Sequence, residues 1–82
     1  MNIAGVLVHA RPEHEAEVET ALAAIGGVEI HAKTDDSRFV VTVEEQGHHL
    51  SDTLIELNHI KGVLSAAMVY QHAEDEEVTE AD

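Results

Sequence analysis

Residues 28–44 read VEIHAKTDDSRFVVTVE, which is two alternating segments on either side of a short polar turn. Successive side chains of a strand point to opposite faces, so alternation of this kind indicates strands with one buried face. Residues 34–37 (TDDS) have the composition of a turn. We therefore predict a β-hairpin. One face of it carries Val28, Ile30, Ala32, Phe39, Val41 and Val43, and the first segment turns Glu29, His31 and Lys33 to the other face.

On each side of this hairpin the sequence predicts one more strand and one helix. Residues 3–10 (IAGVLVHA) are short, rich in β-branched residues and end before Pro12, which suits the first turn of a helix. One helical face then follows at Val18, Ala21, Leu22 and Ile25, before Gly26 and Gly27. After a connection at residues 47–49, a second amphipathic helix carries Leu50, Thr53, Leu54, Leu57 and Ile60. Residues 63–72 (VLSAAMVYQH) form a fourth strand whose two faces are both apolar, so its orientation stays open.

The order strand–helix–strand–strand–helix–strand predicts the α+β class. Two interleaved βαβ units with right-handed crossovers give a ferredoxin-like βαββαβ sandwich. Its four-stranded antiparallel sheet has the order 4-1-3-2, and both helices cover one face. We expect one domain over residues 1–72. Residues 73–82 (AEDEEVTEAD) carry six acids and no base, and we predict a disordered acidic tail.

Composition excludes several classes of function. The 82 residues hold 17 Asp and Glu against 4 Lys and Arg, for a formal charge of −13, and aromatic residues make up 2%. Such a chain repels nucleic acid and anionic membranes, and its charged partners are expected to be basic. It has no cysteine, which excludes disulfides and thiolate metal sites. We find no export signal and no membrane-spanning run, so we expect a cytoplasmic protein with no membrane insertion.

Motifs for catalysis and for metal binding do not stand out. The seven histidines include no H-x-x-x-H on a predicted helix and no H-x-H on a predicted strand. A weak metal site is conceivable only if His9 and His31 share a face. No serine lies in a G-x-S-x-G sequence, and neither a P-loop nor G-x-G-x-x-G is present. The sequence predicts no enzyme, no metal and no cofactor.

The sheet face without helices is the remaining candidate site. If Ala4, Val6 and Val8 pack on the helices, the other face is apolar in the middle and polar at the rim. Gly5 in a central strand would let the backbone or a side chain of a partner approach closely. Such a surface suits an amphipathic basic peptide, or it is simply the wet face of an antiparallel sheet. Its predicted residues are Ile3, Gly5, Leu7, His9, Glu29, His31, Lys33, Arg38, Val40, Thr42 and Glu44.

Four stretches of the sequence resemble the NapD family. They are LVHARPE (7–13), GGVEIHA (26–32), FVVTVE (39–44) and, most specifically, GVLSAAMVYQHAE (62–74). The resemblance implies a ferredoxin-like cytoplasmic chaperone that binds the twin-arginine signal peptide of NapA, the catalytic subunit of the periplasmic nitrate reductase. It also implies that export is delayed until the cofactors of NapA are inserted, and that the peptide lies as a helix across the open sheet.

Alternation then suggests which residues contact the peptide. We expect Leu7, Val40 and Met68 to supply apolar contact, and Glu29 and Glu44 to pair with the two arginines through guanidinium–carboxylate contacts. The oligomeric state stays open, with a monomer favoured. The alternative hypothesis is a small regulatory domain of the same fold that binds a metabolite or dimerises through its open sheet face.

Overall fold

The computed structural model describes residues 2–45 and 49–73. Most of the expected 47–49 connection and the tail beyond Ala73 lie outside the described residues. The described elements are strand β1 (Asn2–Ala10), the short 3-10 helix η1 (Pro12–His14), helix α1 (Glu15–Ala24), strands β2 (Val28–Lys33) and β3 (Arg38–Glu44), helix α2 (Leu50–Asn58) and strand β4 (Val63–Ala73). The predicted order of elements is confirmed, and β4 includes Ala73, which the sequence had assigned to the tail.

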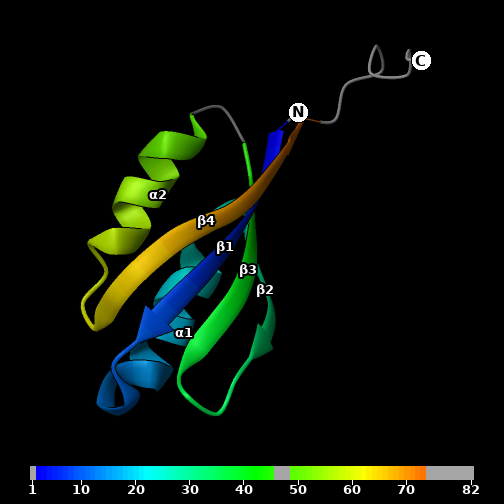
Figure 1. Ribbon diagram of the computed structural model, residues 1–82. Coiled ribbons are helices and arrows are strands. Elements are labelled where there is room, and N and C mark those ends of the chain that lie inside the picture. The colour runs from blue at the N-terminus through cyan, green and yellow to red at the C-terminus, as the bar shows by residue number, and fades with distance from the viewer. Residues whose placement is uncertain (1, 46–48, 74–82) are drawn as a thin grey trace.

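The four strands form one antiparallel sheet in the order β2-β3-β1-β4, as the sequence predicted. Both helices lie against the same face, α1 behind β1 and β3 and α2 beside β4 in the view of Figure 1. This is the α+β, ferredoxin-like arrangement. Its consequence is that the opposite face of the sheet, which we call the open face, is covered by none of the described helices.

The core lies between the sheet and the two helices, and it uses the strand faces that alternation had assigned to it. It consists of apolar side chains from β1, β3, α1 and α2: Ala4, Val6, Val8, Ala10, Val18, Leu22, Phe39, Val41, Val43, Leu50 and Leu57. Phe39, Leu22 and Leu57 are the largest fully buried side chains. Each buried side chain of this size contributes about 1.5–3 kcal/mol relative to exposure. The predicted inward faces of these strands and helices are confirmed.

Gly62 closes the turn between α2 and β4 against the start of α1. Its φ is +96°, and a Cβ there would lie 2.5 Å from the Cβ of His14. Its carbonyl accepts a 2.8 Å hydrogen bond from the backbone N–H of Arg11. Only glycine combines this positive φ with enough space beside the His14 side chain, so another residue here would be strained.

The turn of the hairpin contains the one described non-glycine residue with a positive φ. Ser37 has a φ of 65° and is 2% exposed. Its carbonyl accepts a 2.9 Å hydrogen bond from the N–H of Ala10, at the end of β1, and the Thr34 N–H donates to the Arg38 carbonyl at 2.8 Å. The turn is thus tied to β1 by a backbone bond as well as closed on itself.

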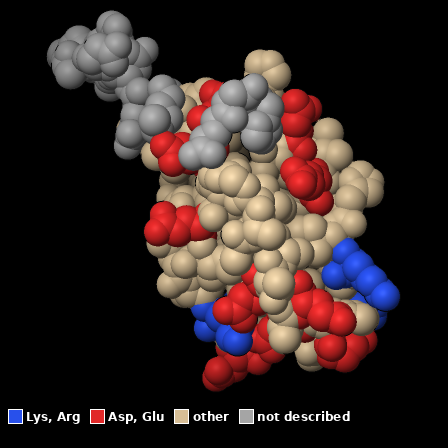
Figure 2. Space-filling view, turned by 180° about the vertical axis from the view of Figure 1, so that it is seen from behind, with Lys and Arg blue, Asp and Glu red and all other residues tan. Residues whose placement is uncertain are grey.

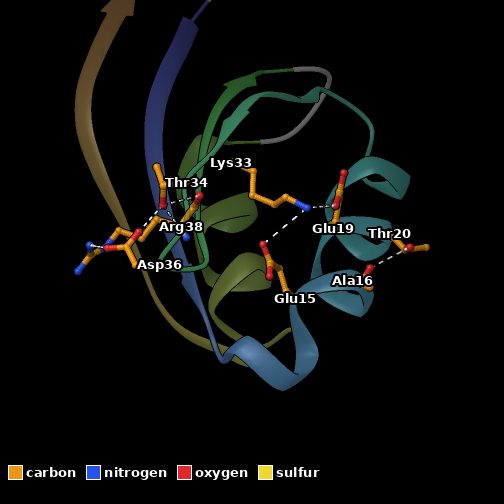
Figure 3. A network of polar contacts seen from close by, with 8 residues as sticks. All are labelled: Glu15, Ala16, Glu19, Thr20, Lys33, Thr34, Asp36 and Arg38. Atoms are coloured by element: carbon orange, nitrogen blue, oxygen red, sulfur yellow. Dashed lines mark hydrogen bonds and ion pairs between the residues drawn. The ribbon is translucent and has the colours of Figure 1, made fainter.

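Strand β2 contradicts one sequence prediction, because its alternation is interrupted. The register with β3 shifts between Ile30 and Ala32, so that Lys33 pairs with the buried Phe39. Lys33 therefore points to the helix side, where its Nζ lies 3.6 Å from Glu15 and 3.4 Å from Glu19 of α1 (Figure 3). The expectations that Lys33 joins the open face and that Ala32 faces the core are both wrong, since a bulge reverses the faces of the residues that follow it.

Candidate functional site

Strand register groups the residues of the open face into four rows that cross the sheet. In antiparallel sheets, paired residues lie on the same face. The first row holds Ser65, His9 and Arg38; the second Ala67, Leu7, Val40 and Ala32; the third Tyr70, Gly5, Thr42 and Glu29; and the fourth His72, Ile3 and Glu44. The register therefore places nine of the eleven residues predicted for this face in these rows. His31 bonds to the side chain of Thr42, which is one of the nine.

The second row is apolar across all four strands. Leu7 at its centre is half-buried, and Val40 beside it is 41% exposed. Ala67 and Ala32 on the outer strands are small and exposed. This row, which we call the apolar strip, offers a shallow band on which an apolar segment could lie. The predicted arrangement of apolar centre and polar rim is confirmed.

Tyr70 of β4 occupies the space that the sequence had left to a partner above Gly5. A Cβ built on Gly5 would lie only 2.1 Å from Cε2 of the Tyr70 ring. The ring therefore lies against the Gly5 backbone on the open face, and Tyr70 itself stays 53% exposed. The prediction that Gly5 admits a partner is wrong, because the chain's own aromatic ring fills the gap. Sequence reasoning missed Tyr70 as a surface residue of this site.

The acidic and polar candidates lie toward one corner of the open face. His31 Nε2 lies 2.8 Å from Thr42 Oγ1 and 4.0 Å from the Glu29 carboxylate. The side chain of Glu29 is 76% exposed, so its carboxylate is accessible to a cation. Glu44 pairs across the sheet with Ile3, one row further along. Both carboxylates that were expected to meet arginines thus lie beyond the same side of the apolar strip.

The opposite end of the open face holds a short polar network. Arg38 contacts the Asp36 carboxylate, which also accepts a hydrogen bond from the Thr34 hydroxyl (Figure 3). The Thr34 hydrogen bond is the main cause that lowers the pKa of Asp36, and the charges of Arg38 and His9 lower it further. His9 shares the row of Arg38. This corner is therefore internally paired.

Met68 lies on the helix side and not on the open face, contrary to the expectation that it contacts the peptide there. The register between β1 and β4 shifts between Gly5 and Val6, so Met68 pairs with the buried Val6. The extra residue of this bulge is Val69, which is 63% exposed. Because both faces of β4 are apolar, alternation could not reveal the bulge. The sequence did hold one signal for Tyr70, namely an aromatic residue on a strand that could pair with the strand of Gly5.

The described residues contain no group of three or more His, Asp or Glu side chains placed to hold a metal ion. None of the described helices is long and apolar enough to cross a membrane. The face seen in Figure 2 carries acidic side chains in several groups around an uncharged centre, and its basic side chains occur only in the lower half. The surface is therefore asymmetric in charge as well as acidic overall.

Comparison with known proteins gives a family. A sequence search against curated proteins found no match. The fold is similar to the solution structure of the E. coli Tat proofreading chaperone protein NapD, with a TM-score of 0.74 and 26% identity over 98% of this chain and 85% of that chain. The sequence model of the NapD protein family matches residues 1–75. The chain therefore belongs to the NapD family.

Proposed function

We propose that this protein is a Tat proofreading chaperone that binds the twin-arginine signal peptide of a precursor on its open face. The observation that carries the proposal is the apolar strip, which crosses four strands and has Glu29 and Glu44 to one side. A twin-arginine peptide joins a basic segment to an apolar one. The apolar strip thus suits the apolar segment of the peptide, and the two glutamates beside the strip suit the adjoining basic segment.

Membership of the NapD family supports a finer proposal about the client. The client is NapA, the catalytic subunit of the periplasmic nitrate reductase, and binding takes place in the cytoplasm. Holding the signal peptide there delays export until the cofactors of NapA are inserted. The chaperone in this proposal performs no chemistry and needs no cofactor of its own.

Two physical effects would act in sequence. The formal charge of −13 attracts a basic segment from a distance and raises the association rate, and this effect weakens as salt is added. Contact with the apolar strip and the Tyr70 ring then removes apolar surface of the peptide from water. The electrostatic attraction thus raises the association rate and selects basic segments. The apolar contact lengthens the lifetime of the complex.

Isothermal titration calorimetry with a synthetic NapA signal peptide tests this proposal. We expect a one-to-one complex whose affinity falls when both arginines are changed to glutamine and when salt is raised. A protein that self-associates without peptide and releases no heat with it would support the alternative, a regulatory domain that dimerises through its sheet. That result would overturn the proposal.

A further inference from the structure

The basic residues of the chain are gathered at one end of the sheet. All four lie in the described part, where Arg11 follows β1, Lys33 ends β2, Arg38 begins β3 and Lys61 precedes β4. In this antiparallel sheet those positions share one end, the lower end in Figure 1. Lys33 and Arg38 are already paired with acids there. We call this the basic end.

The other end of the sheet carries acids, and none of the described Lys or Arg side chains lies there. β1 begins and β3 ends there, next to the start of α2 and the last residues of β4 (Figure 1). Glu44 and Glu45 lie at the end of β3, and Asp52 lies in the first turn of α2. We call this the acidic end. Because every Lys and Arg of the chain lies at the basic end, the described carboxylates of the acidic end have only histidines as basic neighbours and are available to an arriving cation.

The acidic end also has a cavity that no part of the proposed function so far uses. Its volume is about 310 Å³, and it opens between the start of α2 and the ends of β1 and β4. Its apolar wall comes from α2 and β4, and its polar rim from the strand ends. The lining residues are Asn2, Glu45, His49, Leu50, Ser51, Leu54, Met68 and Gln71.

Glu45 is the charged group of this cavity, and it is held in place. Its Oε1 accepts a 2.7 Å hydrogen bond from Asn2 Nδ2, and its backbone N–H donates to the Asn2 carbonyl at 2.9 Å. Its Oε2 lies 3.6 Å from Nδ1 of His49, a side chain that is 85% exposed. The Glu45 side chain itself is only 25% exposed. A fixed carboxylate with an exposed and replaceable neighbour can accept a bond from an arriving cation.

The apolar wall beside this carboxylate selects the kind of cation. Met68 is 44% exposed although it faces the helix side, and Leu54 is half-buried beside it. An arginine or lysine carries its charge on a hydrocarbon stem that buries well against such a wall. A small hydrated cation would gain nothing from that wall. The cavity thus fits a basic side chain of a peptide.

We infer, on the basis of the proposed function, that the cavity at the acidic end binds a basic side chain of the signal peptide. The bound peptide is then oriented, with its arginine-containing segment at the acidic end and its apolar segment on the apolar strip toward the basic end. Ile3 and Glu44, in the fourth row, lie on the path between the strip and the cavity. The peptide's basic segment turns around the ends of β1 and β4 to reach Glu45.

The orientation is tested by paramagnetic relaxation with a synthetic peptide in which two arginines precede an apolar stretch. A nitroxide is attached at the N-terminus of one peptide and at the C-terminus of another, and ¹⁵N spectra of the protein are recorded. We expect the N-terminal label to broaden Asn2 and Gln71, and the C-terminal label to broaden Ser65 and Arg11. The reverse pattern would overturn the inference and leave the proposed function intact. Absence of any binding would instead count against the proposed function, and the inference would fall with it.

A pair of matched variants tests the cavity itself. Glu45→Gln removes the charge but keeps an oxygen for the Asn2 bond, whereas Glu13→Gln removes one charge at the basic end. We expect Glu45→Gln to weaken binding of the arginine peptide at least about fivefold, and to change binding of its glutamine counterpart little. Glu13→Gln should have little effect on either peptide. Equal effects of the two variants would mean that net charge alone acts, and would overturn the cavity assignment.

Discussion

The ring of Tyr70 lies against the backbone of Gly5, with Cε2 only 2.1 Å from where a Cβ on that glycine would stand. The contact joins the edge strand β4 to the central strand β1 on the open face. A glycine weakens a strand because it has no side chain to pack, and an aromatic ring laid across it restores contact. The pair therefore both stabilises the sheet and shapes the surface on which we place the peptide.

Replacing Gly5 should show this coupling directly. In Gly5→Ala the new methyl group collides with the ring, and we expect a loss of about 1–3 kcal/mol in the free energy of unfolding, as for other overpacked sites. In the background of Tyr70→Ala the same change should cost at least about 1 kcal/mol less, because the obstacle is gone. Urea denaturation of the four proteins gives the coupling. Additive effects would mean that the ring does not rest on Gly5.

The apolar strip predicts a binding defect without loss of fold. Leu7→Glu places a charge in the middle of the strip, and we expect signal-peptide affinity to fall at least tenfold, about 1.4 kcal/mol. Ile55→Glu is the matched control, since Ile55 is 57% exposed on α2, away from the open face. Calorimetry measures the affinities, and circular dichroism checks the fold. Global unfolding of Leu7→Glu, or equal weakening by the control, would contradict the assigned face.

Asp36 predicts a pH dependence of stability. Its pKa lies below the ordinary value, mainly because the Thr34 hydroxyl donates to it and in part because Arg38 is near. A carboxylate with a lowered native pKa adds stability at neutral pH, and this contribution is lost as the pH falls through the native value. Asp36→Asn should therefore be less stable than the parent near pH 7, with the difference vanishing in acid.

Thermal melts between neutral pH and about pH 3 measure this difference. Asp35→Asn makes the same change of net charge one residue away in the same turn, and it serves as the control. If the difference in melting temperature between parent and Asp36→Asn stays constant or widens toward acid, the Asp36 carboxylate is not the source of the pH-dependent stability.

Ser37 predicts a stabilising substitution. Its φ of 65° is the left-handed region, which costs a residue with a Cβ about 1–2 kcal/mol. Ser37→Gly should raise the free energy of unfolding by about 1 kcal/mol after the added entropy of the unfolded chain is counted. Ser65→Gly, at an extended position in β4, should instead lower it. A destabilised Ser37→Gly would show that the serine side chain contributes more than its backbone costs.

Most of the fold could be predicted from sequence because its strands and helices follow regular periods. Phe39, Val41 and Val43 alternate, and Leu50, Thr53 and Leu57 recur at helical spacing, so the hydrophobic pattern alone gives the inward faces. Errors arose where an extra residue breaks the period. The bulge after Ile30 turns Lys33 to α1, and the bulge at Val69 turns Met68 to α2. A bulge depends on cross-strand pairing, which no local pattern records.

The candidate site was predictable to the same extent. Leu7, Val40, Thr42 and Glu44 lie on the expected face because β1 and β3 pair without a bulge along their shared length. The position of the Tyr70 ring over Gly5 and the cavity beside Glu45 could not be derived from local pattern, since both depend on the register of β4. That strand is apolar on both faces, so its sequence does not indicate which side chains point to the core.

The most direct test of the central claim, that the open face of the sheet binds the signal peptide, is a ¹⁵N chemical-shift titration of the protein with the NapA peptide. We predict that the largest changes fall on Leu7, Val40, Thr42 and Tyr70, while residues on the outer surface of α1, such as Ala16 and Thr20, change little. Changes concentrated on α1 and α2 with the open face undisturbed would contradict the claim.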